Sequence, residues 1–102
     1  MPESIQSLNV DSAKLDKLCR DYNVKQLAVF GSYLRGEQTP ASDLDLLIEF
    51  QQGKAPGLLR FFTLEGAFTD LFDKSVDLST LGFLHSSFRD DVKRHAQPIY
   101  AR

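Results

Sequence analysis

Apolar residues recur at helical intervals near the start of the chain, and further along they alternate with polar ones. The first pattern predicts a short amphipathic helix that packs on a sheet, with Asp11 or Ser12 as its N-cap. After it, three strands are expected, at residues 26–30, 43–50 and 74–79. The apolar positions of the helix, spaced i, i+3, i+4 and i+7, are Leu15, Leu18, Cys19 and Tyr22.

The middle strand separates acidic from apolar side chains. Residues 43–50 read DLDLLIEF, and successive side chains of a strand point to opposite faces of the sheet. Asp43, Asp45 and Glu49 therefore share one face, and the opposite face is apolar. We interpret the acidic face as the face that carries the site.

Two more helices are expected in the second half of the chain. One follows the polar connector QQGKAPG and contains apolar residues from Leu58 to Phe72, and the other ends before Pro98. The phenylalanines from Phe61 to Phe72 fit either a core or a partner surface. This order of elements predicts an α+β fold, a small mixed β-sheet with helices packed on one side.

The composition is that of an ordinary globular protein. The chain has 102 residues, of which 42% are apolar and 25% charged, so a single domain over residues 1–102 is expected. Its net charge is −2 and its basic residues are scattered, which argues against direct binding to nucleic acid. A single cysteine, a start without signal-peptide character and the lack of a membrane-length apolar run favour a cytoplasmic location.

A loop and three aspartates are the candidates for chemistry. Gly31 and Ser32 directly follow the first expected strand, where backbone N–H groups and a hydroxyl can hold phosphate oxygens. Asp43 and Asp45 are spaced i, i+2, and Asp77 lies on the third expected strand. If those strands are neighbours about 4.8 Å apart, the carboxylates converge on one or two Mg²⁺ ions. This combination predicts metal-assisted nucleotidyl transfer.

The expected reaction is an in-line displacement at the α-phosphorus of ATP, with pyrophosphate as the leaving group. Two Mg²⁺ ions about 3.5–4 Å apart would steady the attacking and leaving oxygens, with Asp43 and Asp45 bridging both ions. Asp77 would complete the shell of the metal ion nearer the acceptor, and it would lower the pKa of the acceptor hydroxyl or accept its proton.

Each of these residues also has an ordinary interpretation. A lone D-x-D at a strand start is usually a solvated edge or turn, and Asp77 alone fits a strand-end surface residue. Arg35 would clamp a phosphate oxygen, or it would pair with Glu37 or Asp43 and fix the loop. Ser42 would touch the nucleotide, or it would hydrogen-bond within its own loop. The joint pattern favours the site.

Residues 31–50, GSYLRGEQTPASDLDLLIEF, resemble the signature of the minimal nucleotidyltransferases in the DNA polymerase beta-like superfamily. That signature is G-S-x-x-R-G, a short polar spacer and S-D-x-D-L. The apolar helix leading into V-D-L and the terminal Pro-Ile-Tyr-Ala also resemble the family. The resemblance implies that the Gly-Ser pair holds a nucleoside triphosphate, that Asp43 and Asp45 ligate Mg²⁺, and that Asp77 is the third carboxylate.

Many members of that family are antitoxins encoded with a HEPN-type ribonuclease toxin, and some adenylylate a tyrosine on the toxin. The first hypothesis is therefore a Mg²⁺-dependent transferase that moves AMP from ATP to a hydroxyl of such a toxin, because the chain is too short to contain an acceptor domain. The second is a non-catalytic antitoxin that neutralises its partner by binding. The third is a small-molecule nucleotidyltransferase, which usually requires an added substrate-binding domain.

Overall fold

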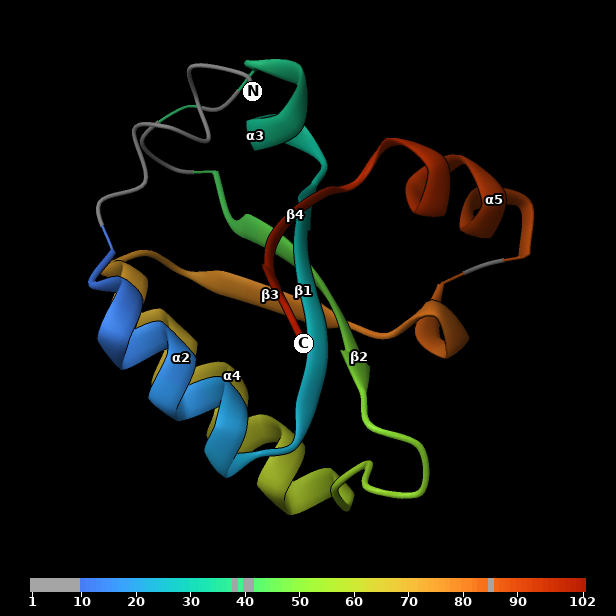
Figure 1. The fold of residues 1–102 in the computed structure, drawn as a ribbon. Coiled ribbons are helices and arrows are strands. Elements are labelled where there is room, and N and C mark those ends of the chain that lie inside the picture. Colours follow the sequence, from blue (N-terminus) through green and yellow to red (C-terminus); the bar gives the residue numbers. More distant parts are fainter. Residues whose placement is uncertain (1–9, 38, 40–41, 85) are drawn as a thin grey trace.

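The computed structural model describes most of the chain and shows a four-stranded sheet with helices on both sides. The residues that it describes are 10–37, 39, 42–84 and 86–102, with only the backbone for Leu34, Arg35 and Phe83. Within these ranges no helix is long and apolar enough to cross a membrane. The elements (Figure 1) are α2 (Ser12–Asp21), β1 (Val24–Phe30), α3 (Ser32–Arg35), β2 (Leu44–Phe50), α4 (Leu58–Phe72), β3 (Val76–Ser79), the 3-10 helix η1 (Leu81–Phe83), α5 (Ser86–His95) and β4 (Gln97–Ala101).

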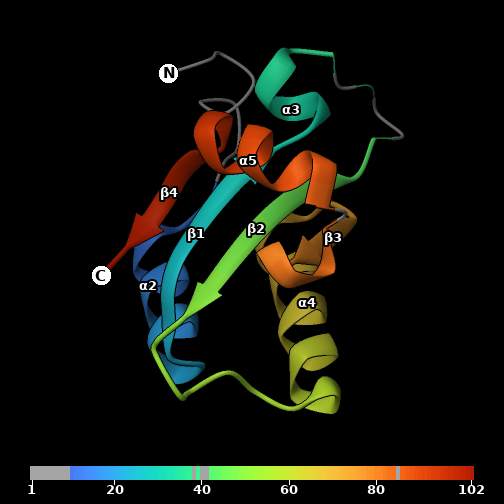
Figure 2. The same ribbon diagram turned by 90° about the vertical axis from the view of Figure 1, so that its right-hand side faces the viewer.

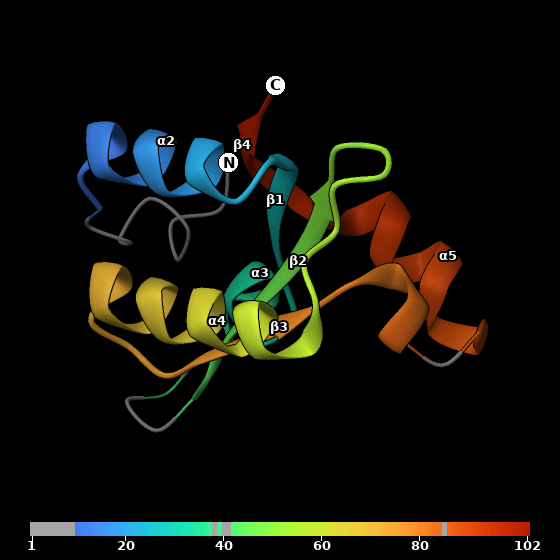
Figure 3. The same cartoon turned by 90° about the horizontal axis from the view of Figure 1, so that it is seen from below.

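The strands lie in the order β3-β2-β1-β4. β1 is antiparallel to both β2 and β4, whereas β2 and β3 are parallel, so the sheet is mixed. Figure 3 shows α2 and α4 together on one side of the sheet and α5 on the other side, and in Figure 2 α5 lies in front of the sheet. The α+β fold with a small mixed sheet is confirmed. The sequence predicts helices on one side of the sheet, but α5 lies on the other side from α2 and α4 (Figure 3). None of the ten residues of α5 is buried.

The core lies between the sheet and the layer formed by α2 and α4. The alternation expected for β2 is confirmed, because Leu44, Leu46 and Ile48 are buried whereas Asp45 and Glu49 are not. The acidic side chains therefore lie on the face of the sheet opposite α2 and α4. On the covered face, α4 contributes the buried residues Phe61, Leu64, Phe68 and Phe72.

The phenylalanine-rich helix α4 is divided between core and surface. Three of its phenylalanines pack in the core, but Phe62 is 55% exposed. Leu58 and Leu59, in the same first turns, are 64% and 83% exposed. The first turns of α4 thus present an apolar surface of the kind that partners cover.

α2 begins where the sequence predicts. Asp11 is its N-cap, and its carboxylate accepts hydrogen bonds from the backbone N–H groups of Ala13 and Lys14. Cys19 is fully buried on its apolar face, and burial, with a smaller contribution from the nearby Asp16 carboxylate, raises the pKa of the Cys19 thiol to about 12. This cysteine is therefore a core residue rather than a reactive one.

The strand β4 is not predicted from the sequence. Pro98 suggests only the end of a helix, but Gln97–Ala101 forms an edge strand beside β1. An edge position tolerates proline because the missing N–H can face away from the neighbouring strand. The pairing also shifts register between Leu27 and Ala28, so the strand carries little periodic signal.

Candidate active site

The loop after β1 places the backbone of Gly31 against the carboxylate of Asp45. Gly31 has φ +74° and caps the start of α3, in a region of backbone conformation that favours glycine. A Cβ at this position would overlap the Asp45 carboxylate oxygen and lie 2.9 Å from its Cγ. A residue with a side chain would thus displace Asp45. Glycine is required here for both its conformation and its size.

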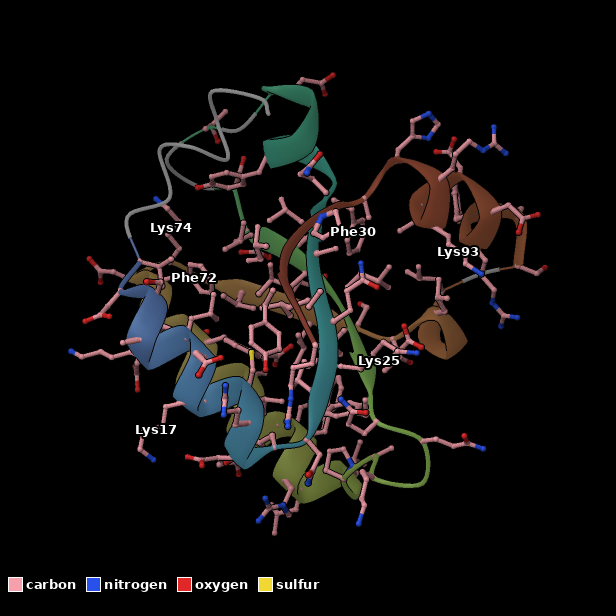
Figure 4. The ribbon with its side chains drawn as sticks, viewed as in Figure 1. Lys17, Lys25, Phe30, Phe72, Lys74 and Lys93 are labelled. Carbon is pink, nitrogen blue, oxygen red and sulfur yellow. The ribbon has the colours of Figure 1, made fainter. Side chains whose placement is uncertain are left out.

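The neighbouring residues fix the position of this loop. Tyr33, in the single turn of α3, is buried and belongs to the hydrophobic core, and the Lys74 ammonium lies 5.7 Å from the centre of its ring. The Glu37 N–H donates a hydrogen bond to the Ser32 carbonyl at 2.9 Å. Ser32, half-buried, is therefore held at the end of β1, directly after Gly31. Figure 4 marks Phe30, the last residue of β1, and Lys74.

The aspartates of β2 and β3 lie side by side. Asp45 and Asp77 are direct partners in the parallel ladder of these strands, which places their backbones about 4.8 Å apart. The Leu44 N–H donates to the Ser75 carbonyl at 2.8 Å and ties the starts of the two strands together. Asp43 is exposed and immediately precedes β2. A shared site requires the strands of Asp45 and Asp77 to be neighbours, and β2 and β3 are neighbours.

A glutamate that sequence reasoning missed supports the strand that carries Asp77. β3 is an edge strand, and its Leu78 N–H donates to Glu65 Oε2 of α4 at 2.9 Å. A hydrogen bond to a carboxylate is stronger than one between neutral groups. In the sequence, a glutamate thirteen residues away on a helix gives no sign of this contact.

The carboxylates suit Mg²⁺ by their chemistry. Asp45 and Asp77 offer only oxygen ligands from adjacent strands, and Asp43 is two residues from Asp45; oxygen ligands of this type are those that Mg²⁺ takes. Among the residues that the structure describes, no three His, Cys, Asp or Glu side chains form a group that could hold a metal ion. Like charges repel where no cation lies between them.

The nucleotide contacts predicted for Ser42 and Arg35 both stay predictions. The Ser42 hydroxyl accepts a hydrogen bond from the Thr39 N–H at 2.8 Å and lies 3.2 Å from the Thr39 hydroxyl. The structure thus shows Ser42 in the loop-stabilising role, and its nucleotide role stays a prediction. The side chain of Arg35 lies outside the described part of the chain, so its phosphate contact also stays a prediction.

Comparison with known proteins identifies the family. Residues 12–99 match the nucleotidyltransferase domain family. The protein adenylyltransferase MntA of Thermococcus cleftensis is 36% identical over 92 residues, which are 90% of this chain and 89% of MntA.

Two solved structures share the fold. A chain in a toxin-antitoxin crystal structure with AMP-PNP has a TM-score of 0.71 at 22% identity, over 91% of this chain and 75% of that one. A chain in the complex of a tri-AMPylated Shewanella oneidensis HEPN toxin with an MNT antitoxin has a TM-score of 0.62 at 20% identity, over 88% and 69%. At these identities the likeness concerns the fold. The match over residues 12–99 and the 36% identity with MntA show that the chain belongs to the nucleotidyltransferase domain family, as a minimal nucleotidyltransferase of the MntA type.

Proposed function

We propose that this chain is a Mg²⁺-dependent protein adenylyltransferase that transfers AMP from ATP to a hydroxyl of a partner protein. The observation that carries the proposal is the placement of Asp45 beside Asp77, with the Gly31 backbone against the Asp45 carboxylate. The loop backbone that would bind phosphate and the acidic side chains therefore lie at the same end of the sheet. The relative MntA, similar over most of both chains, is a protein adenylyltransferase.

In this proposal, Asp43, Asp45 and Asp77 would hold Mg²⁺. When bound, Mg²⁺ offsets the negative charge that develops on the α-phosphate and favours deprotonation of the attacking hydroxyl. The Gly31–Ser32 loop contributes backbone N–H groups and the Ser32 hydroxyl to the β- and γ-phosphates. Because Tyr33 is anchored in the core, the loop is preorganised for that contact.

The proposed transfer is a single displacement at the α-phosphorus of ATP. The acceptor oxygen forms a bond to the α-phosphorus, the bond between the α-phosphorus and the oxygen leading to the β-phosphate breaks, and pyrophosphate leaves. Asp77 accepts the proton of the acceptor hydroxyl. Its exposure on an edge strand leaves room for an acceptor carried by another molecule.

The acceptor in this proposal is a hydroxyl, of the kind that tyrosine carries, on a HEPN-type toxin, and the chain acts as the antitoxin. Support comes from the solved complex of the same fold in which the HEPN toxin is AMPylated. The exposed Phe62, Leu58 and Leu59 at the start of α4 favour a second function, neutralisation of the toxin by binding alone. The two functions differ in their need for nucleotide.

Transfer from isotopically labelled ATP tests the proposal. With Mg²⁺ and the HEPN-type toxin that the proposal names as acceptor, label at the α-phosphate of ATP should appear on the toxin and label at the γ-phosphate should not, because pyrophosphate leaves. Chelation of Mg²⁺ by EDTA should stop the labelling. Labelling from the γ-phosphate, or from neither position, would contradict the proposed reaction.

A further inference from the structure

β3, the strand that carries Asp77, is bonded to α4 along its outer edge. The strand lies at the edge of the sheet, where the backbone N–H groups on the outer side have no neighbouring strand to bond with. α4 packs against β3 (Figure 3), and the Leu78 N–H donates to Glu65 Oε2 of this helix at 2.9 Å. β3 is therefore held by β2 on one side and by Glu65 on the other.

The helix that carries Glu65 is a rigid support. Leu64 and Phe68, which lie before and after Glu65 on α4, are fully buried in the core. The Lys74 N–H donates to the Thr69 carbonyl at 3.3 Å and fixes the turn between α4 and β3. Because a close-packed core resists displacement, the backbone of Glu65 stays in place and its carboxylate is a fixed acceptor.

The hydrogen bond acts on the peptide plane next to Asp77. The Leu78 N–H and the Asp77 carbonyl belong to one planar peptide unit. An acceptor that fixes the direction of this N–H therefore restricts the ψ angle of Asp77, and through it the direction in which the Asp77 side chain leaves the strand. Leu78 is buried whereas Asp77 is exposed, so their side chains point to opposite faces of the sheet. Glu65 thus acts through β3 on a carboxylate of the other face.

We infer that Glu65 is a positioning residue for Asp77 in adenylyl transfer, an inference that rests on the proposed function. In the proposed reaction Asp77 accepts the proton of the acceptor hydroxyl, and a base must lie within hydrogen-bond reach of the proton that it takes. Glu65 keeps Asp77 within that reach. Without the hydrogen bond from Leu78, β3 loses its tie to α4, and Asp77 spends less time in the productive position.

Three variants of Glu65 separate the reach of its side chain from its charge. Glu65→Gln keeps the length and an oxygen acceptor, although a neutral acceptor forms a weaker hydrogen bond than a carboxylate. Glu65→Asp keeps the charge but is one methylene shorter, so its carboxylate falls short of the Leu78 N–H. Glu65→Ala removes the acceptor altogether.

Rates of AMP transfer to the HEPN-type toxin are measured at a temperature well below the melting temperatures of all variants. Glu65→Ala and Glu65→Asp should lower kcat by about tenfold, because a small displacement of a catalytic group slows a reaction steeply. Glu65→Gln should keep kcat within about threefold of the wild type. The KM for ATP should stay unchanged, since the Gly31–Ser32 loop follows β1 and not β3. If Glu65→Ala fails to fold, Glu65→Asp decides.

Two control variants and a spectroscopic measurement identify an effect on stability alone. Asp70→Ala removes a carboxylate from an exposed position of α4, and Leu18→Ala removes a side chain that packs against the core from α2. Both should keep kcat, although Leu18→Ala should melt at a lower temperature. In nuclear magnetic resonance spectra of the free protein, Glu65→Ala and Glu65→Asp should shift the backbone resonances of Asp77, which report its ψ angle. Hydrogen exchange of the Leu78 N–H should become faster.

The possible failures are distinguishable. Wild-type kcat in folded Glu65→Ala, or a loss no larger than that of Leu18→Ala, would overturn the inference and leave the proposed function standing. A lower kcat with unchanged Asp77 resonances, or a raised KM for ATP with unchanged kcat, would also overturn it, because Glu65 would then act elsewhere. A wild type that transfers no AMP would overturn the proposed function and the inference together.

Discussion

Asp45→Asn is expected to lower adenylyl transfer by at least about a hundredfold while leaving the fold intact. A metal-held transition state is stabilised by several kcal/mol, and each 1.4 kcal/mol is a factor of ten in rate. Asparagine keeps the shape of the side chain but removes the charge that faces Asp77 on the neighbouring strand. Because carboxylates repel one another without metal, the melting temperature of the apoprotein should be unchanged or higher.

Rates of transfer at saturating ATP, together with thermal melting, check this result. Asp70→Asn is the control, since it makes the same chemical change at an exposed position of α4 outside the proposed site, and it should retain full transfer. Asp43→Asn is expected to behave like Asp45→Asn. Full transfer by Asp45→Asn would refute the assignment of the metal-binding carboxylates.

Gly31→Ala is expected to reduce transfer by about a hundredfold and to lower the stability of the protein. The backbone angles of Gly31, φ +74° and ψ −147°, lie in a region that is essentially restricted to glycine and would cost an alanine about 1–3 kcal/mol. The new Cβ would also overlap the Asp45 carboxylate and move it from its position beside Asp77. Misplacement of a catalytic group by about 1 Å can reduce a rate about a hundredfold.

Gly36→Ala is the control that separates the effect of backbone strain from the effect of displacing the Asp45 carboxylate. Gly36 also has a positive φ, of +71°, but a Cβ built on it meets nothing within 4 Å. The control should therefore lose about 1–2 kcal/mol of the free energy of unfolding, less than Gly31→Ala loses, as measured by urea denaturation, and it should keep its transfer activity. Equal activity losses in both variants would show that the contact between Gly31 and Asp45 has no role in the reaction.

Periodicity predicts most of the fold because the burial of one face leaves a direct trace in the sequence. In β2, each apolar position expected to face the core is buried, and α4 contains the apolar stripe expected from the sequence. β4 leaves no such trace, since it is a short edge strand with Pro98 near its start and an irregular register against β1. Its pairing is determined by contacts distant in sequence.

The site is predictable in its residues but not in its contacts. Spacing alone places Asp43 and Asp45 together, whereas the pairing of Asp45 with Asp77 depends on the crossover through α4 that makes β2 and β3 parallel neighbours. The contact of Gly31 with Asp45 and the support of β3 by Glu65 arise from tertiary packing. Local sequence patterns carry no information on them.

Turnover distinguishes an adenylyltransferase from an antitoxin that acts only by binding. The direct measurement is the intact mass of the HEPN-type toxin after mixing with ATP, Mg²⁺ and a small fraction of its concentration of this chain. An enzyme acts repeatedly, so most of the excess toxin should carry covalent AMP, and Asp77→Asn should give no adduct although it still binds the toxin across a broad interface. Toxin without any adduct, together with neutralisation that needs one chain per binding site, would contradict the account.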